Sequence, residues 1–165
     1  MNQKSCPNEQ IWQIIDLENL PDGRHRLAEY AHSCQGIGSF ATLADWVADD
    51  LLEDYECVYV AVCKEEIIGF VALLKEFVCL DDEREPWLDF LFVDEAKRNR
   101  GIGTALIERV INHAAELSFE YLYIGTQSHK EYYVKNGFSE IERVYEYNGS
   151  KNEIPMYLMR RQVGL

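Results

Sequence analysis

Residues 91–104 read Leu-Phe-Val-Asp-Glu-Ala-Lys-Arg-Asn-Arg-Gly-Ile-Gly-Thr, and this stretch decides the fold of the chain. It continues an apolar run that begins at Trp87, and it opens an amphipathic segment that extends to about Ser118. This change of pattern predicts a buried strand, a tight loop and the N-terminus of a helix. The backbone N–H groups of such a loop, the helix dipole, Arg98 and Arg100 all face one place, which favours a phosphorylated ligand.

Two glycines, Gly101 and Gly103, lie in the predicted loop. Because glycine has no Cβ, it accepts a positive φ and lets a pyrophosphate lie against the main chain. The spacing excludes a P-loop, since no Lys follows Gly103, and it excludes the Gly-x-Gly-x-x-Gly dinucleotide motif, since Leu106 occupies the third glycine position. The remaining pattern is Arg-x-x-Gly-x-Gly. Its alternative interpretation is a glycine-loosened turn between strand and helix.

Residues 98–103, preceded by Leu-Phe-Val at 91–93, resemble the Arg/Gln-x-x-Gly-x-Gly/Ala coenzyme A motif of the GNAT superfamily of N-acetyltransferases. Residues 132–138 (Tyr-Tyr-Val-Lys-Asn-Gly-Phe) resemble the family's second motif, Phe-Tyr-x-Lys-x-Gly-Phe. The two motifs occur in the family order, although Glu95 stands where members usually carry Pro. The motif-bearing part covers about residues 58–160, and the first fifty residues resemble the family only loosely.

The resemblance implies that acetyl-CoA is the cosubstrate, with its pyrophosphate on the loop and its pantetheine along the strand edge. Backbone amides near Phe92 and Val93 then polarise the thioester carbonyl, as an oxyanion hole does. As surface charges in a bend, Arg98 and Arg100 have an alternative interpretation without a ligand. The residues expected to bind the coenzyme are Leu91, Phe92, Val93, Arg98, Asn99, Arg100, Gly101, Ile102, Gly103 and Thr104.

Acetyl transfer to an amine requires an acid for the departing thiolate, and Tyr133 is the candidate. A tyrosine pKa of about 10 keeps the hydroxyl protonated at neutral pH, close enough to a thiol pKa of about 8.5 for exchange. Tyr133 also matches the family's tyrosine acid by position, whereas Tyr132 occupies the usual Phe position and is expected in the core. Aromatic packing is the alternative role for Tyr133.

Asp89 is the candidate base, because it is the only acid in a strand of Trp, Leu and Phe. Strand alternation places Asp89, Leu91 and Val93 on one face, and burial raises the pKa of a carboxyl group. Some family members have a catalytic Glu at this point, so the shorter Asp89 requires a relaying water. A polar partner to a neighbouring residue is the alternative. Thr126 stands where many members have a coenzyme-binding Asn, and the lack of a Ser, Cys or His nucleophile constellation favours direct transfer.

Length and composition predict one soluble domain, residues 1–165, with 47% hydrophobic and 27% charged residues. The longest uncharged apolar run, 67–74, is too short to span a membrane, and residues 1–10 lack the apolar region of a secretory signal, so we expect a cytoplasmic protein. Five cysteines without a Cys-x-x-Cys motif suit a reduced compartment. The four histidines have no ligand spacing, so we expect no metal site.

The formal net charge of −13 argues against nucleic acid as a partner. It suits a cationic small molecule, and it also serves solubility alone. Six acids and no base lie between residues 45 and 56. Such a run is commonly a solvated helix face. In the family, however, the first two helices border the acceptor slot, so this run is also a candidate for attracting an amine.

The order of predicted elements gives the fold class: a single-domain, GNAT-like α/β protein with a mixed, mostly antiparallel sheet flanked by helices. Exposed edges of that sheet favour a homodimer. Residues 35–39, which contain a second Gly-x-Gly, are expected to form a loop. We expect strands at 11–17, 57–63, 67–75, 87–93, 121–126, 140–147 and 153–160, and helices at 24–33, 42–54, 101–118 and 128–136.

Three functions remain open at this point. The first is an N-acetyltransferase that acts on a primary amine of a small molecule, and the second is an acetyltransferase for a protein N-terminus or lysine. The third is an acyl-CoA-binding module without turnover. The presence of both Asp89 and Tyr133 favours an enzyme over the module.

Overall fold

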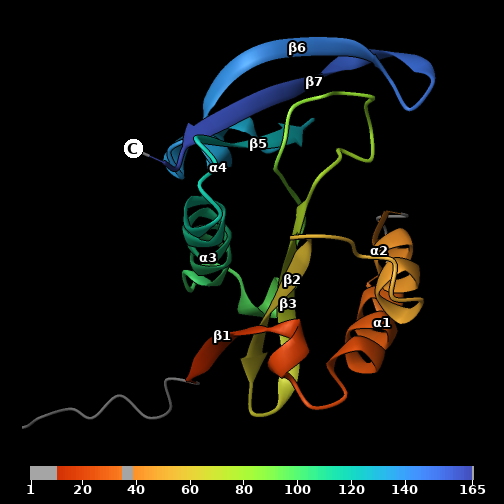
Figure 1. The fold of residues 1–165 in the computed structure, drawn as a ribbon, viewed down its shortest axis with the longest axis vertical. Helices are drawn as coiled ribbons and strands as arrows, with labels where there is room; N and C mark the ends of the chain where they lie inside the picture. Colours follow the sequence, from red (N-terminus) through yellow and green to blue (C-terminus); the bar gives the residue numbers. More distant parts are fainter. Residues whose placement is uncertain (1–10, 35–38, 165) are drawn as a thin grey trace, which may run out of the picture.

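The computed structural model describes residues 11–34 and 39–164, and its elements occur in the expected order (Figure 1). The strands are β1 (Trp12–Asp16), β2 (Cys57–Cys63), β3 (Glu66–Leu74), β4 (Trp87–Val93), β5 (Tyr121–Thr126), β6 (Ser139–Tyr147) and β7 (Ser150–Gln162). The helices are α1 (Gly23–Ser33), α2 (Ser39–Ala48), α3 (Ile102–Glu116) and α4 (Lys130–Lys135), with short 3-10 turns at Leu17–Asn19 and Glu95–Lys97.

One seven-stranded sheet has the order β1-β2-β3-β4-β5-β7-β6. Every neighbouring pair is antiparallel except β4 and β5, which are parallel and paired only at Trp87 and Tyr123. The C-terminal part of β4 therefore has no strand partner on its β5 side. The mixed, mostly antiparallel α/β fold expected from the sequence is confirmed, and the sheet has an opening beside the end of β4.

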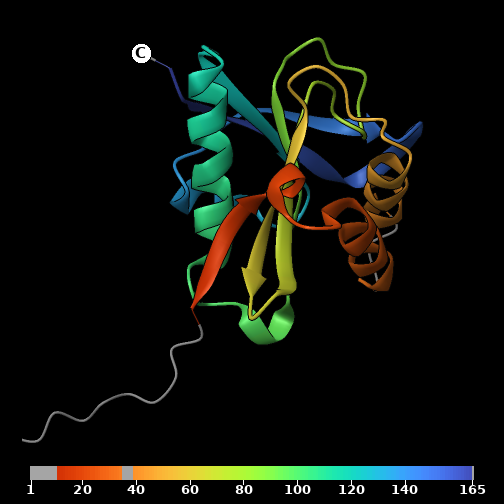
Figure 2. The same ribbon diagram turned by 60° about the horizontal axis from the view of Figure 1, so that its bottom comes forward.

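Helix α3 covers one face of the sheet, and α1 and α2 cover the other, as the views in Figures 1 and 2 both show. The side of α3 that faces the sheet is apolar, so burying it holds the helix in place. Leu117 follows the last residue of the helix and is 38% exposed. The buried residues of α3 are Ile102, Leu106, Ile107, Val110, Ile111 and Ala114.

The helix expected at residues 42–54 is shorter than the sequence predicts, since α2 ends at Ala48. Asp50 and Asp54 follow it with φ angles of 56° and 51°, which a continuing helix cannot contain. Leu51, which follows α2, is 55% exposed. The loop expected at residues 35–39 lies almost wholly outside the described residues, and α2 begins at residue 39.

A β-bulge interrupts β4 just after Asp89. Phe92 pairs with Phe70, and Asp89 pairs with Ala72, so two residues of β4 stand opposite one residue of β3. One of the two, Phe90, has a φ of 54°, in the left-handed region that a bulky side chain rarely adopts. The extra residue reverses the alternation of side chains along the strand.

Because of this reversal, Asp89 does not share a face with Leu91 and Val93, and the expectation from alternation is wrong. Leu91 and Val93 pack on the α3 side of the sheet, whereas Asp89 is paired with Ala72 of the α1–α2 side. A bulge depends on pairing with the neighbouring strand, so local alternation contains no sign of it.

Gly69 of β3 allows the close approach of β4 at this point. A Cβ atom on Gly69 would lie 2.7 Å from the carbonyl oxygen of Phe92, which is too close for any other residue type. The register between β2 and β3 also shifts beside Gly69. The register shift and the close approach of the Phe92 carbonyl group therefore occur at the same glycine.

Tyr30 of α1 ties the α1–α2 layer to the end of β4. Its hydroxyl donates a hydrogen bond to Oδ1 of Asp94 at 2.7 Å, and its ring packs edge-on against Phe70 and Phe92. Burial and the Asp94 carboxylate raise the pKa of Tyr30. This contact sets where the first two helices lie relative to the bulged strand.

We expect Tyr30→Phe to lower the free energy of unfolding by about 1 kcal/mol, because it removes one partly buried hydrogen bond and keeps the ring contacts. Urea unfolding measures the change. Tyr145→Phe is the matched control, since Tyr145 is 50% exposed on β6. Equal unfolding free energies for the two variants would contradict a structural role for the Tyr30–Asp94 bond.

Candidate functional site

A cleft of about 450 Å³ opens beside the end of β4, where β5 is not paired with it. We call it the α3 cleft, because the first turn of α3 forms one wall and α4 the other. It brings together every residue expected to bind the coenzyme except Arg100, which is exposed outside the lining. The lining consists of Leu91, Phe92, Val93, Arg98, Asn99, Gly101, Ile102, Gly103, Thr104, His129, Tyr132 and Tyr133.

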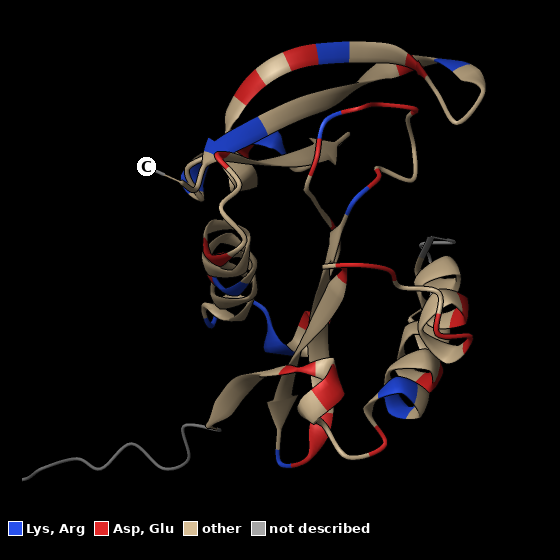
Figure 3. Cartoon of the chain, viewed as in Figure 1, with Lys and Arg blue, Asp and Glu red and all other residues tan. Residues whose placement is uncertain are grey.

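The loop that enters α3 suits an anion. Asn99 and Gly101 have φ angles of 60° and 77°, and Gly101 begins α3 without a side-chain cap. The N–H groups at the start of a helix have no intrahelical partner, and they carry the positive end of its dipole. Arg98 adds a guanidinium group, whose Nε donates to the Val93 carbonyl oxygen at 3.0 Å. This basic loop is the blue segment leading into α3 in Figure 3.

Gly103 lies in close contact with the Tyr132 side chain of α4. A Cβ atom at position 103 would collide with the Tyr132 hydroxyl. Tyr132 is half-buried and lines the α3 cleft, so it is not only the core residue that its position predicted. Burial raises the pKa of Tyr132, and hydrogen bonds with Thr104 and Asn136 oppose that rise.

His129 also lines the α3 cleft, and sequence reasoning missed it. It precedes α4, and its backbone N–H donates to Oγ1 of Thr126 at 3.1 Å. Thr126, at the family's Asn position, thus holds the entry to α4. No sequence motif includes His129. The sequence offers one indication of its position: it lies four residues, about one helical turn, before Tyr133.

Tyr133 lies in α4 and faces the same cleft, with its ring edge-on to Tyr132 and Phe138 at 5.5 and 5.8 Å between centroids. Burial is the main cause that raises the pKa of Tyr133, and the negative charge of Asp89 adds to it. The hydroxyl is therefore protonated at neutral pH and available as a proton donor.

Asp89 lies at the bulge of β4. Its Oδ1 accepts a hydrogen bond from the Phe90 N–H at 2.7 Å. Within residues 11–34 and 39–164, its Oδ2 is the one buried side-chain nitrogen or oxygen without a hydrogen-bond partner. Burial raises the pKa of Asp89 to about 6, and the Phe90 N–H opposes that rise. A carboxylate in this setting can accept a proton near neutral pH.

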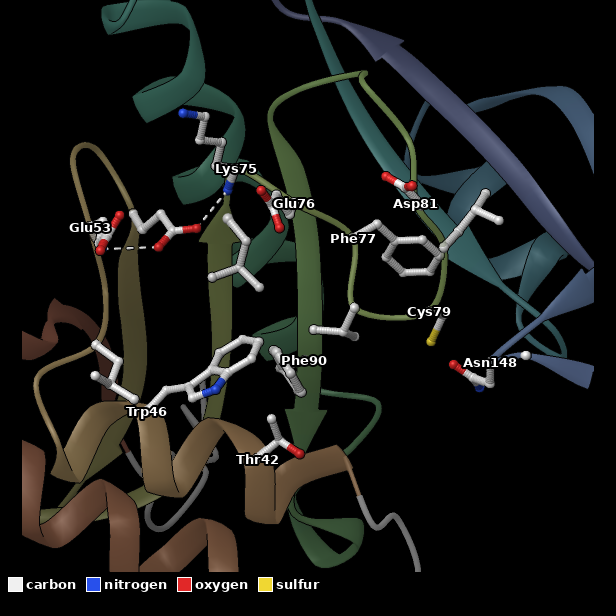
Figure 4. A pocket seen from close by; sticks show the side chains of 16 residues that line it. Thr42, Trp46, Glu53, Lys75, Glu76, Phe77, Cys79, Asp81, Phe90 and Asn148 are labelled. Atoms are coloured by element: carbon white, nitrogen blue, oxygen red, sulfur yellow. Dashed lines mark hydrogen bonds between the residues drawn. The ribbon is translucent and has the colours of Figure 1, made fainter.

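A second cavity, of about 910 Å³, lies on the opposite side of β4, and we call it the α2 cavity (Figure 4). It is bounded by α2, by the loop that follows β3, and by the turn between β6 and β7. Three aromatic side chains, those of Trp46, Phe77 and Phe90, contribute to its wall. The charged residues of its lining are Glu53, Glu56, Glu76, Asp81 and Lys75.

Asp89 lies close to residues of both cavities. Burial is the main cause that raises the pKa of Tyr133, which lines the α3 cleft, and of Cys79, which lines the α2 cavity, and the negative charge of Asp89 adds to both shifts. The next residue after Asp89 lines the α2 cavity, and the one after that lines the α3 cleft. A basic cleft, a buried carboxylate and an acidic cavity therefore occur together along a single strand.

A free strand edge beside β4 and a helix N-terminus without a side-chain cap suit an anionic cofactor, as expected for a coenzyme-dependent acyltransferase. Residues 14–138 match the Acetyltransferase (GNAT) family. The chain belongs to this family, and membership supports acyltransferase activity.

Solved structures share this fold over nearly the whole chain. An aminoglycoside 6'-N-acetyltransferase complexed with coenzyme A has 18% identity and a TM-score of 0.69, with 93% of this chain and 97% of that chain covered. A GNAT-family acetyltransferase from Staphylococcus aureus Mu50 has 22% identity and a TM-score of 0.66, with 93% and 99% covered. A spermidine N-acetyltransferase SpeG chimera from Vibrio cholerae and hSSAT has 16% identity and a TM-score of 0.66, with 92% and 95% covered.

No curated protein sequence matches the chain at a significant level. In the described part of the chain, no group of three or more His, Cys, Asp or Glu side chains is placed to hold a metal ion. None of the described helices combines the length and the apolar character needed to cross a membrane.

The buried Asp89 carboxylate lowers stability at neutral pH, and we expect Asp89→Asn to reverse this. Because the pKa of Asp89 is raised from 3.8 to about 6, the native state holds a proton that the unfolded state releases, so stability falls as pH rises between these values. The variant should be more stable than the wild type by about 3 kcal/mol at pH 7.5 and by only about 1 kcal/mol at pH 4.5.

Urea unfolding at the two pH values measures this gap. Asp49→Asn is the matched control, because Asp49 is an exposed acid just after α2 and should change stability little at either pH. A gap for Asp89→Asn that stays the same at both pH values would contradict a raised pKa.

Proposed function

We propose that the protein is an N-acetyltransferase that moves an acetyl group from acetyl-CoA to a primary amine of a small cationic molecule by direct transfer. The observation that carries the proposal is the buried carboxylate of Asp89 in β4, whose Oδ2 is unpartnered among the described residues. Asp89 directly precedes Phe90 of the acidic α2 cavity and Leu91 of the basic α3 cleft. The two substrates would then approach one strand from opposite sides.

The α3 cleft fits the coenzyme. The residues proposed to hold its pyrophosphate are those of the loop from Arg98 to Thr104, by main-chain N–H groups and by the Arg98 guanidinium. Arg100, exposed outside the lining, would contribute charge rather than contact. Bound acetyl-CoA supplies an activated acetyl thioester. Leu91, Phe92 and Val93 present the free edge of β4 to the pantetheine, and N–H groups there would stabilise negative charge on the carbonyl oxygen.

Asp89 and Tyr133 are proposed to handle the two protons of the reaction. The ammonium group of the acceptor must lose a proton before it attacks, and the unpartnered Oδ2 of Asp89 can accept it through a relaying water. The leaving thiolate must gain a proton, and the Tyr133 hydroxyl lines the cleft where it departs. No covalent acetyl-enzyme is required in this scheme.

The proposal that the acceptor is cationic is based on the acidic lining of the α2 cavity. Its four acids and one base should attract a cation. Aminoglycoside and spermidine N-acetyltransferases, which act on small amines, have similar folds. A protein N-terminus or lysine acceptor is the second enzymatic candidate. An acyl-CoA-binding module without turnover is the third candidate. The unpartnered Oδ2 of the Asp89 carboxylate argues against this candidate, because a module that only binds has no need of a proton acceptor.

A thiol-release screen with acetyl-CoA and polyamines, aminoglycosides, amino acids and peptides tests activity and acceptor class together. We expect coenzyme A release with the small cationic amines. Turnover with peptides alone would favour the protein-acetylating alternative. Acetyl-CoA binding without thiol release from any amine would favour the binding module.

We expect Tyr133→Phe to lower kcat by about 100-fold or more with little change in KM for the acceptor, because general acid catalysis contributes about that factor. Steady-state thiol release across pH measures the effect. Tyr145→Phe, an exposed tyrosine on β6, serves as the control with full activity. Full turnover of Tyr133→Phe at every pH would remove Tyr133 as the acid.

We expect the wild-type kcat/KM to fall below an apparent pKa of about 6, since Asp89 must be ionised to accept a proton. Asp89→Asn should acetylate about 100-fold more slowly above about pH 6, where the wild-type carboxylate is ionised, and should lose this acidic limb. Asp49→Asn again provides the control. An unchanged rate for Asp89→Asn above about pH 6 would show that another group is the base.

Three further expectations remain proposals: a single domain over residues 1–165, a cytoplasmic location and a homodimer. The fold supports the first, because one sheet extends from β1 to β7. A homodimer could form through β1 or β6, the two edge strands of the sheet, since each has a strand neighbour on one side only among the described residues. Sedimentation of the purified chain tests it.

A further inference from the structure

The rim of the α2 cavity carries carboxylates that have no partner in the described structure. No hydrogen bond or ion pair reaches the side chains of Glu53, Glu76 or Asp81 from residues 11–34 or 39–164, and all three are exposed at the cavity (Figure 4). Lys75 is the only cation of the lining, and its Nζ lies 4.0 Å from Asp54, which is not part of it.

Glu56, the fourth acid of the lining, has a different role. Its two carboxylate oxygens accept backbone N–H groups from Glu53 and Lys75, at 3.0 and 2.9 Å. These bonds hold the segment after α2 against the end of β3. The Glu56 carboxylate therefore has a structural role. The carboxylates of Glu53, Glu76 and Asp81 remain available to a ligand.

The wall below this rim is apolar. Trp46 lies edge-on to Phe90 with 5.9 Å between ring centroids, and both line the cavity together with the buried Leu74 and Phe77. Methylene groups pack well on such a surface, and an ammonium group is attracted to aromatic faces. Few uncharged polar side chains are available for a ligand rich in hydroxyl groups: the lining has only Thr42 and Asn148 besides Cys79.

The part of the cavity at Phe90 requires a ligand group in a different protonation state from the groups that bind at the rim. Asp89, whose Oδ2 is buried without a partner, directly precedes Phe90 of the cavity wall. An amine that reacts there has given up a proton, so it no longer needs a counter-charge. Carboxylates at the rim, by contrast, are matched only by groups that stay protonated.

We infer that the acceptor is a linear aliphatic oligoamine, which reacts through one terminal amine while its other ammonium groups bind Glu53, Glu76 and Asp81. Its methylene chain lies on Trp46 and Phe90. This inference rests on the proposed acetyl transfer, and it deepens that function by naming the acceptor class. Amino sugars and peptide N-termini are less well matched, because they bring hydroxyl or peptide groups that the apolar wall does not satisfy.

The test compares two amines with the same reacting end, bis(3-aminopropyl)amine and propylamine, by initial rates of thiol release from saturating acetyl-CoA. We expect kcat/KM to be about 10-fold higher for the triamine at low ionic strength, because each of its two remaining ammonium groups contributes about threefold in an exposed ion pair. Added salt should reduce this advantage, since it screens exposed charges.

Glu53→Gln, Glu76→Gln and Asp81→Asn should each raise KM for the triamine, by up to about threefold, and should change KM for propylamine less. Asp49→Asn, in the same acidic run but outside the cavity, should change neither amine. A loss that affected both amines equally would overturn the inference.

Equal kcat/KM for the two amines would overturn the oligoamine inference alone and leave acetyl transfer intact. A higher kcat/KM for kanamycin or for trialanine than for the triamine would likewise overturn the assigned acceptor class. Absence of thiol release with every one of these amines would overturn the proposed function itself, and the inference with it.

Discussion

The bulge in β4 is the constraint on which the rest of the site depends. A left-handed conformation at Phe90 costs about 1–2 kcal/mol, and the surrounding packing must maintain it. That packing comes from both sides: Gly69 admits the β4 backbone closely, and Phe92 lies within a cluster of rings that includes Phe40 and Phe70. The bulge reverses the alternation of side chains along the strand. As a result, Phe90 faces the α1–α2 side of the sheet and Leu91 faces the α3 side.

Two cavities of opposite character result from this reversal. On the α3 side, the strand meets a basic loop and an uncapped helix N-terminus. On the α2 side, the strand forms part of an acidic, aromatic cavity. The net charge of −13 is thus not uniform, since Arg98 and Arg100 border one face, whereas Glu53, Glu76 and Asp81 border the other. Such a separation allows an anionic and a cationic substrate to approach without competing for one entrance.

Asp89 illustrates how a reactive group lowers the stability of the fold that holds it. A buried carboxylate with one unpartnered oxygen is unfavourable, and no lysine or arginine within residues 11–34 and 39–164 forms an ion pair with it. A paired cation would stabilise the ionised form and lower the pKa of Asp89, which would weaken it as a proton acceptor near neutral pH. The same absence of a partner that reduces stability therefore suits the group to proton transfer.

The sequence by itself determined the mixed α/β fold, most element boundaries and the loop and strand residues of the α3 cleft. These features depend on local information: apolar periodicity, the glycines of the loop, and two short motifs whose order is read directly along the chain. Gly69 is a further local feature, because a glycine inside a strand commonly marks a bulge or the close approach of another backbone.

Only the tertiary structure decided the face on which Asp89 lies, the early end of α2 at Ala48, and the place of His129 in the cleft. Each depends on a partner distant in sequence. The bulge arises from the register with β3, and the α2 cavity is assembled from segments as far apart as Thr42 and Gly149. Periodicity reports how a segment alternates along its own length, and it contains no information on what a neighbouring strand or loop will place opposite it.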